Sequence, residues 1–319
     1  MKLCVNNMQD LSDKLRLIYK PIVLITIGFI LTYTFLHWAL FIKAGISTLK
    51  EGIVNYWLPL GLSWIPILIW LRPRIKLLNY NDGNNILKYQ FLINIAIVLP
   101  TAFAQQYLIT ATSKLTQLDN ITQISQHDKT KYYSLKNCYI DKLHIAVQNT
   151  FFVSGKFNDE YNMYIYIAMP ILENDTDTVK ADNKYWLGKI YHEQISNMRS
   201  DEEKNDEFKV FAAKTEKEFD ETDFSKFTYL EVVGDTEDHD EFNNALKNFG
   251  QSSTGDNIVF EAKTTPFEAR NGNKLLLFFG TLGIGLLVNL LPLLSPKLQI
   301  SELEKSKNGK IKNNDTQQA

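Results

Sequence analysis

The chain has 319 residues, with 34 Lys and Arg, 36 Asp and Glu, and only two cysteines, Cys4 and Cys138. Residues 109–273 carry a net charge of −11 and the rest of the chain +9, which excludes nucleic acid as the partner of the acidic segment because phosphate binding needs a basic surface. Two cysteines separated by apolar segments cannot form a disulfide framework, so the acidic segment must be stabilised by its own core.

Three apolar segments precede the acidic segment, at about residues 21–42, 53–71 and 88–108, and a fourth follows it at 274–294. Each is long enough to cross a hydrocarbon layer of about 30 Å at about 1.5 Å per residue. The first is too long for a signal peptide and has no cleavage pattern after it, so we interpret it as an anchor. We expect Asn94 and Asn289 to bond across helices, and Thr281 and Gly285 to form a small-residue packing pair.

Basic residues in short loops predict the orientation of these helices. They lie in the N-terminal segment 1–20, in the loop that contains Arg72, Arg74 and Lys76, and in a polar tail, 295–319, which we expect to be disordered. All three should be cytoplasmic. The chain is therefore predicted to be a multi-pass protein of the bacterial inner (cytoplasmic) membrane, with residues 109–273 on the extracytoplasmic side.

Residues 109–273 alternate between strand and helix patterns. Thr112–Thr130 is expected to be a helical extension and linker. Leu143, Ile145, Val147, Phe151 and Val153 share one parity, which predicts a half-buried strand at 141–154 with these side chains on its buried face. The stretch 161–172 is apolar on both faces, which predicts a central strand or one with a helix packed on its second side. Further strands are expected at 184–194, 227–233 and 257–262.

Ser200 and Glu203 form a capping-box pattern that starts a helix, and a second helix carries Phe242, Leu246 and Phe249 on one face. The fold class is an α+β domain, mostly antiparallel sheet with helices on one face, inserted between about four membrane spans.

Four stretches of the chain carry a resemblance: 57–78 (WLPLGLSWIPILIWLRPRIKLL), 110–118 (TATSKLTQL), 131–142 (KYYSLKNCYIDK) and 266–274 (PFEARNGNK). Together they resemble the long non-catalytic N-terminal region of some bacterial rhomboid-family intramembrane serine proteases. The resemblance covers about residues 15–300. It implies membrane helices, an outer domain and one further span before a six-span catalytic domain with a G-x-S-G serine. These 319 residues contain no G-x-S-G, so the resemblance implies a protease-associated module without the protease.

Ser63 and His37 give the sharpest enzymatic hypothesis, an atypical intramembrane serine protease or hydrolase built on a Ser–His dyad. In the predicted topology Ser63 lies about 7 Å deeper in the membrane than His37, counted at about 1.5 Å per residue. The competing interpretation is that Ser63 bonds a carbonyl of its own helix and that His37 lies near the outer interface. We favour the second interpretation and assign no catalytic residue.

Other polar residues offer no complete site. Residue types that bind metals occur together at Asp238, His239 and Asp240, and again at His192 and Glu193. Adjacent residues point in different directions, however, and no further cluster completes a tetrahedral set of ligands. A solvated helix start is the better interpretation of the acidic group. Cys138 is expected to be a small core residue rather than a nucleophile, and His127 and His144 are expected to be solvated. No metal or cofactor is predicted.

Aromatic residues are dense on the adjacent strands of the outer domain: Tyr161, Tyr164, Tyr166, Tyr185, Trp186 and Tyr191. Most must be core, but an exposed aromatic sheet face with acidic surroundings would suit a protein partner. The sequence therefore favours a membrane-anchored, non-catalytic binding or regulatory module. Its expected partners are the lipid bilayer and another membrane or envelope protein. A small-molecule sensor is a weaker alternative, because only a short segment lies inside to transmit a signal.

Overall fold

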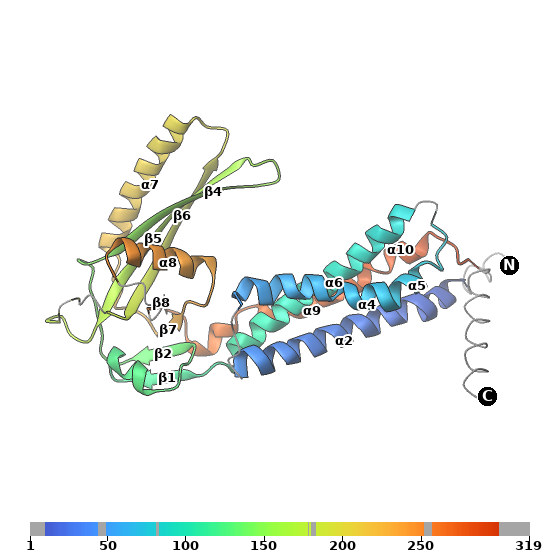
Figure 1. Ribbon diagram of the computed structural model, residues 1–319, viewed down its shortest axis with the longest axis horizontal. Helices are drawn as coiled ribbons and strands as arrows, with labels where there is room; N and C mark the ends of the chain where they lie inside the picture. Colours follow the sequence, from blue (N-terminus) through green and yellow to red (C-terminus); the bar gives the residue numbers. More distant parts are fainter. Residues whose placement is uncertain are drawn as a thin grey trace. The chain divides into compact units, whose positions relative to one another are not determined.

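A computed structural model describes residues 10–43, 49–80, 83–177, 179, 183–251 and 257–299 (Figure 1). Cys4 and the predicted tail from residue 300 onward lie outside the described residues. The chain divides into two compact units. A helical unit comprises residues 1–111 and 271–319, and a sheet unit comprises Thr112–Arg270.

The helical unit contains four helices that are long and apolar enough to cross a membrane: Asp10–Lys43, Ile53–Ile75, Asn84–Thr112 and Phe267–Leu294. Their α-helical parts are α2 (Lys20–His37), α3 (Leu58–Leu62), α4 (Trp64–Pro66), α5 (Arg72–Ile75), α6 (Gly83–Thr112), α9 (Lys274–Val288) and α10 (Leu291–Leu294). Wider π-helical turns at Leu15–Tyr19, Trp38–Lys43, Ile53–Trp57 and Ile67–Leu71 complete the first two helices. The four predicted apolar segments are thus confirmed as helices.

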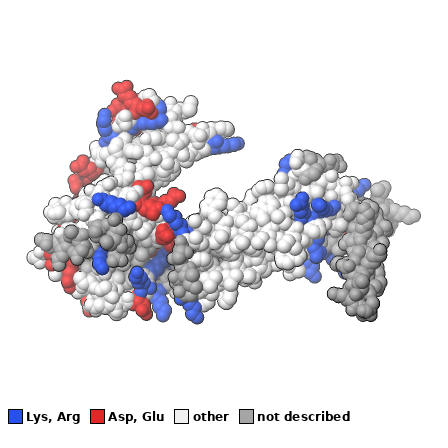
Figure 2. All heavy atoms as spheres, in the orientation of Figure 1, with Lys and Arg blue, Asp and Glu red and all other residues white. Residues whose placement is uncertain are grey.

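Composition explains why this unit is helical and where its helices are irregular. On the face drawn in Figure 2, the middle of the helical unit is free of charged side chains, as a hydrocarbon environment requires. Pro59 and Pro66 lack a backbone N–H and divide the second helix into short pieces. Pro100 lies inside α6, which continues past it.

Interhelical contacts in this unit agree with only part of the prediction. The Asn94 side-chain amide on α6 donates to the Leu60 carbonyl oxygen on α3 at 3.2 Å, which confirms a bond across helices. Asn289 differs: its side-chain amide donates to the Gly285 carbonyl oxygen one turn earlier at 2.7 Å. Gly285 itself packs closely on α6, because a Cβ there would meet the Ala96 Cβ at 3.0 Å. Thr281 bonds the Leu277 carbonyl oxygen of its own helix at 2.7 Å.

The chain after α10 is paired rather than irregular as far as residue 299. Asn79 donates its N–H to the Lys297 carbonyl oxygen at 2.8 Å, and Gln299 donates to the Leu77 carbonyl oxygen at 2.8 Å. Leu78 and Leu298 form the antiparallel bridge between these bonds. The expectation of disorder from residue 295 is therefore wrong for its first residues.

The sheet unit is built on eight strands: β1 (Leu115–Leu118), β2 (Tyr132–Leu135), β3 (Tyr139–Ile140), β4 (Ala146–Ser154), β5 (Glu160–Leu172), β6 (Tyr185–Ser196), β7 (Tyr229–Val232) and β8 (Ile258–Lys263). Their order is β1-β2-β7-β8-β6-β5-β3, with β4 also paired to β5 (Figure 1). The β1–β2 and β6–β8 pairs are parallel and the other pairs antiparallel. The sheet is mixed, which corrects the prediction of a mostly antiparallel one.

Two long helices cover opposite faces of this sheet, which corrects the prediction of helices on one face. α7 (Asp201–Glu221) contributes Phe211 and Phe219 to a core that includes Met163 and Ile165 of β5. α8 (Glu237–Asn248) contributes its apolar side chains to a second core, with Tyr166 of β5. Odd and even residues of one strand point to opposite faces, so the two cores lie on the two sides of β5.

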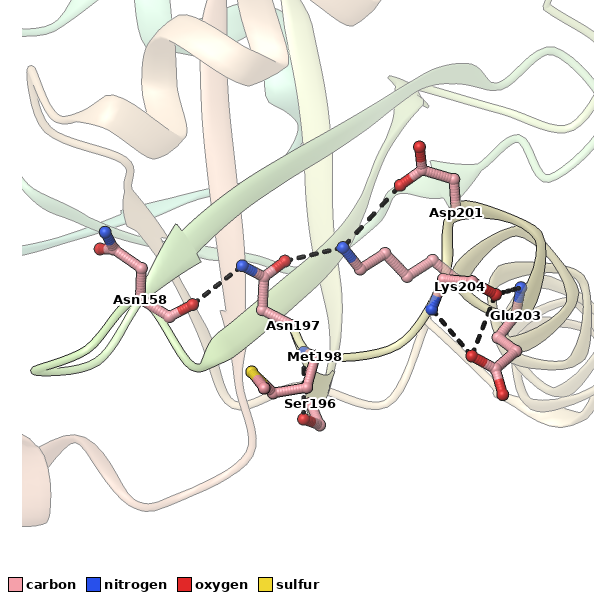
Figure 3. A network of polar contacts seen from close by, with 8 residues as sticks. Asn158, Ser196, Asn197, Met198, Asp201, Glu203 and Lys204 are labelled. Carbon is pink, nitrogen blue, oxygen red and sulfur yellow. Dashed lines mark hydrogen bonds and ion pairs between the residues drawn. The ribbon is translucent and has the colours of Figure 1, made fainter.

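The start of α7 is fixed by a local polar network (Figure 3). The Ser200 hydroxyl accepts the Glu203 N–H at 3.2 Å and the Glu203 carboxylate accepts the Ser200 N–H at 2.8 Å, which confirms the predicted capping box. Lys204 donates to the Asn197 side-chain oxygen at 2.8 Å, and the Asn197 amide donates to the Asn158 carbonyl oxygen at 2.8 Å. The network therefore ties the turn between β4 and β5 to the first turn of α7.

Short strands were missed where the sequence has little periodicity. The segment Thr112–Thr130, predicted as a helical linker, contains β1 and a 3-10 turn at Ile121–Gln126.

β4 begins only at Ala146, because residues before it form a turn around Asp141, whose carboxylate accepts the Leu143 N–H at 2.8 Å. Its predicted buried parity is also wrong: Leu143 is 84 % exposed, whereas Ala146 on the other parity is buried. A second 3-10 turn, Phe267–Asn271, precedes α9.

Candidate interaction surface

Ser63 and His37, the two residues of the enzymatic hypothesis, have different neighbours. The Ser63 hydroxyl donates to the Leu60 carbonyl oxygen of its own helix at 3.3 Å and accepts the Asn94 side-chain amide at 2.6 Å. His37 stacks on Phe41 with ring centroids 5.4 Å apart. Among the described residues no hydrogen bond joins His37 to Ser63. The hydroxyl is therefore held in two hydrogen bonds, and neither of them involves His37.

The acidic residues at the start of α8 are arranged by helix capping. Thr236 accepts the His239 N–H through its hydroxyl at 3.3 Å, and carboxylates at this end are favoured by the helix dipole. Ligand atoms of Asp235, His239 and Asp240 lie within 4.8 Å of one another. Asp238, which belonged to the trio considered from the sequence, instead accepts the Tyr166 hydroxyl at 2.9 Å. The cluster is that of a capped helix start.

The remaining candidates lie apart from one another. Glu193 points away from His192 and pairs with Lys214 at 3.3 Å. Cys138 is half-buried, and burial raises the pKa of its thiol, which favours the unreactive protonated form. His144 lies 2.7 Å from the Asp141 carboxylate, with its imidazole largely exposed, and His127 is exposed. Within the described residues, no hydrogen bond or ion pair joins any two of these candidates.

One group of side chains does form a continuous surface. Tyr164 of β5 lies between two other rings: its centroid is 5.3 Å from Phe152 of β4 and 4.2 Å from His192 of β6, and both pairs are stacked. We call these three residues the aromatic row. Phe152 is 47 % exposed, His192 is exposed and Tyr164 is half-buried. The row thus crosses three strands on one face of the sheet with part of each ring open to solvent.

The position of α8 explains why the row is open. Phe242 packs edge-on against Tyr166 with centroids 5.4 Å apart. Tyr166 comes two residues after Tyr164 in β5, so both side chains lie on the same face of the sheet. Gly188 lets the helix approach this end, because a Cβ there would meet the Phe242 ring at 2.5 Å. In Figure 1 the hairpin of β4 and β5 extends beyond α8. The helix therefore covers one end of this face and leaves the end that carries the row.

A buried amide holds the row in place. Asn162 of β5 is 4 % exposed, and its side-chain oxygen lies 3.0 Å from the His192 Nε2. Its amide donates to the Ser154 hydroxyl at 2.8 Å, and that hydroxyl donates to the Glu160 carboxylate at 2.6 Å. Because all four side chains lie on the same face of β4, β5 and β6, the chain of bonds fixes the orientation of the His192 ring without covering it.

Carboxylates border the row on the side of α8. Thr150 donates to the Glu241 carboxylate at 2.8 Å, and Asp238 accepts from Tyr166. Burial raises the pKa of both Tyr164 and Tyr166, helped by the Asp238 charge at Tyr164 and by the hydrogen bond to Asp238 at Tyr166, so their hydroxyls stay neutral. The surface therefore combines flat rings with fixed negative charge.

The sequence indicated only the centre of this surface. Most of the predicted aromatic cluster is core: Trp186, Tyr166 and Tyr191 are 0, 5 and 6 % exposed. Phe152 and His192 were not singled out as its partners. Their strand parity relative to Tyr164 was the available signal, since all three numbers are even, but only the register of β4, β5 and β6 brings them side by side.

Comparison of the chain with family models, with curated proteins and with solved structures finds no match in any of the three. The resemblance to the N-terminal region of rhomboid-family proteases stays a prediction from the sequence segments quoted above.

Proposed function

We propose that this chain is a membrane-anchored binding or regulatory module without catalysis of its own, which recognises another membrane or envelope protein. The observation that carries the proposal is the aromatic row on a sheet face that α8 leaves open. Exposed, pre-organised aromatic rings are typical of the centres of protein interfaces, and charged groups are more common at the rims. The relation to the non-catalytic region of rhomboid-type proteases belongs to the same proposal.

The location of the sheet unit is part of this proposal. Arg72, Arg74 and Lys76 lie at the end of the second helix and predict a cytoplasmic position for that end. The same rule places the sheet unit outside the cytoplasmic membrane. Alkaline phosphatase fused after Asn174, in the turn that follows β5, is expected to be active, because the enzyme folds only outside the cytoplasm. An active β-galactosidase fusion at this position, with inactive phosphatase, would reverse the orientation.

The partner is expected to present basic and aliphatic side chains. Residues 109–273 carry a net charge of −11, and Asp238 and Glu241 lie beside the row. An arginine can stack on an aromatic ring and at the same time bond a carboxylate, which a lysine does less well. Binding should therefore weaken as the salt concentration rises, because the exposed carboxylates are screened.

In-cell photo-crosslinking tests the proposed function. Benzoylphenylalanine at position 192 places the reactive group in the aromatic row, and the same residue at position 157 is the matched control, because Phe157 is 79 % exposed but lies in the hairpin turn outside the row. We expect position 192 to give an adduct with one envelope protein, and Tyr164→Ala to reduce it by about tenfold, as loss of an interface centre does. Absent adducts, or equal adducts from both positions, would overturn the proposal.

A further inference from the structure

β4 forms an edge of the sheet. It pairs with β5 over nine positions and, within the described part of the chain, with no other strand. An edge strand can pair with a strand of another protein, and natural edges are commonly protected by lysine, proline or a bulge. The sequence of β4, AVQNTFFVS, contains no charged residue and no proline. The edge therefore lacks the side chains that commonly prevent such pairing.

Two backbone bonds show which residues of β4 point their N–H and C=O groups outward. Asp141 donates its N–H to the Pro170 carbonyl oxygen at 3.1 Å, on the side of β5 that pairs with β3 and β4. Asn197 donates to the Asp159 carbonyl oxygen at 2.8 Å, on the side that pairs with β6. Since the backbone groups of a strand alternate between its two sides, the even residues of β5 bond β4. Even residues of β4 lie opposite them, so its odd residues, from Val147 to Val153, direct their backbone groups away from β5.

On the face covered by α8 the edge carries an aromatic ring and a carboxylate. Phe152 is 47 % exposed, and Thr150, two residues earlier and thus on the same face, donates to the Glu241 carboxylate at 2.8 Å. An arginine beside this pair can stack on the ring and bond the carboxylate. Glu241 and the net charge of −11 on residues 109–273 oppose a second copy of this chain at the edge and favour a basic occupant.

The α7 face of the same edge is apolar. Phe151 stacks on Tyr161 with centroids 5.9 Å apart and meets Phe208 of α7 edge-on at 5.1 Å. Phe151, Val147 and Val153 share this face and are 43, 41 and 44 % exposed. Aliphatic side chains of a further strand would cover them, and pairs of aromatic and β-branched side chains stabilise neighbouring strands. The two faces of the edge therefore suit different side chains at alternate positions.

We propose that β4 accepts an extended segment of the partner protein as a further antiparallel strand, in which basic and aliphatic residues alternate. The basic side chains lie on the α8 face beside Phe152 and Glu241, and the aliphatic ones on the α7 face beside Phe151. Backbone bonds to the odd residues of β4 supply affinity, and the alternation supplies specificity. Antiparallel pairing is the more stable per residue. The Gln148 side-chain amide, which donates to the Asn149 carbonyl oxygen at 3.3 Å, has to turn aside. This inference rests on the proposed function, because it specifies how the partner of the aromatic row binds.

Proline substitution tests the backbone pairing in the full chain. Asn149→Pro removes an outward N–H and leaves the bonds to β5 in place, as proline does where edge strands tolerate it. Asn149→Ala is the matched control, because it removes the same side chain and keeps the N–H. Both changes are made in the chain that carries benzoylphenylalanine at position 192. We expect Asn149→Pro to reduce the adduct with the envelope protein about tenfold, and Asn149→Ala to reduce it less than about twofold.

The adduct also separates this inference from the proposed function. An undiminished adduct in Asn149→Pro overturns the strand pairing and leaves the proposed function intact. Equal losses in both variants assign the effect to the side chain and also overturn the pairing. Absence of the adduct in the chain without either change is a failure of the proposed function, and peptide binding then decides the inference alone.

A synthetic peptide tests the pairing on the wild-type chain in nanodiscs. The probe alternates arginine and valine and is blocked at both ends, and its affinity is measured by fluorescence anisotropy. Residues directly opposite each other in an antiparallel pair share a face, so the valines lie opposite the odd residues of β4 and turn their N–H groups toward it. N-methylation of the valines therefore removes the donors to β4. N-methylation of the arginines, whose N–H groups point away from β4, is the matched control.

We expect the N-methylvaline peptide, and a peptide with glutamate in place of arginine, each to bind at least about ten times more weakly than the probe. The N-methylarginine peptide should stay within about twofold of the probe. No binding of the probe, equal binding of the glutamate peptide, or equal losses from both N-methylations overturns the inference. A dimeric wild-type particle that Asn149→Pro makes monomeric places a second copy on the edge and overturns it as well.

Discussion

Lys142 holds the end of α7 through Phe219: its Nζ donates to the Phe219 carbonyl oxygen at 2.8 Å and lies 5.0 Å from the centroid of the same residue's ring. The same ammonium group donates to the carbonyl oxygens of Asp220 at 3.0 Å and Thr222 at 3.1 Å. The last carbonyls of a helix have no partner within the helix, and a cation there also meets the negative end of its dipole. One side chain from the turn before β4 thus completes a helix about 80 residues away.

Replacing this lysine should loosen the end of α7. Lys142→Met keeps the apolar stem but leaves three carbonyl oxygens without their donor, and we expect a loss of about 2 kcal/mol in the free energy of unfolding of the sheet unit. Amide hydrogen exchange in the last turn of α7 should rise with it. Lys156→Met is the control, because Lys156 is exposed and lies over a single ring; its effect should stay below about 0.5 kcal/mol. Equal losses from both variants would contradict the capping role.

Gly188 has no room for a side chain. A Cβ at this position would meet the Phe242 Cζ at 2.5 Å and the Val259 Cγ1 at 2.9 Å. Gly188→Ala should therefore lower the free energy of unfolding by about 1–3 kcal/mol through overpacking between β6 and α8. Phe242→Leu in the same chain removes the ring atoms in question and should recover part of that loss, as a double-mutant cycle measured by chemical unfolding would show. Strict additivity of the two substitutions would rule out this contact as the cause.

Asp141 should make the sheet unit sensitive to acid. Burial opposes ionisation of its carboxyl, but hydrogen bonds from the Leu143 N–H and from His144 prevail, and the pKa lies below its usual value of 3.8. The ionised form is therefore favoured in the folded state, so the stabilisation is present above pH 3.8 and is lost as the pH falls through the lowered pKa. Asp141→Asn should reduce stability at neutral pH and flatten this acid limb of a stability–pH profile. If the stability of Asp141→Asn fell with decreasing pH as steeply as that of the wild type, Asp141 would not be the source of the acid sensitivity.

Ser63 should not react with a fluorophosphonate. Its hydroxyl is fully buried, donates within its own helix and accepts from Asn94, so no base is positioned to activate it. Wild-type membranes are expected to show no labelled band at the mass of this chain. A band that disappears in Ser63→Ala, or in His37→Ala, would instead favour the serine-hydrolase hypothesis over the binding module.

Local patterns in the sequence predicted the elements that depend on local chemistry. The capping box at Ser200 and Glu203 and the apolar stripe of α8 follow from local spacing. The structure confirms the capping box and the burial of Phe242 and Leu246, whereas Phe249, the third member of the predicted stripe, is the C-cap residue and is 37 % exposed. The apolar character of both faces of β5 indicated packing on two sides, yet helices were expected on one face only. Which helix covers which face depends on crossover connections, and these leave no periodic signal.

Long-range pairing explains the other errors. The parallel pairing of β6 with β8 joins Tyr185 to Ile258 across more than a whole helix–strand–helix segment, and no local pattern encodes it. The odd side chains of β4 looked like a buried face, but the strand lies at an edge where Phe151 and Val153 are only half covered. For the same reason Tyr164 was recognised as part of an aromatic group, whereas its neighbours Phe152 and His192 became visible only with the register.

The bonds from Asn158 through Asn197 to Lys204 give the β4–β5 hairpin a mechanical property. A hairpin that extends past its covering helix would ordinarily bend independently of the rest of the sheet. Here the hairpin turn is bonded to the first turn of α7, the helix Asp201–Glu221. Displacing the tip of the hairpin would therefore displace the start of α7 with it.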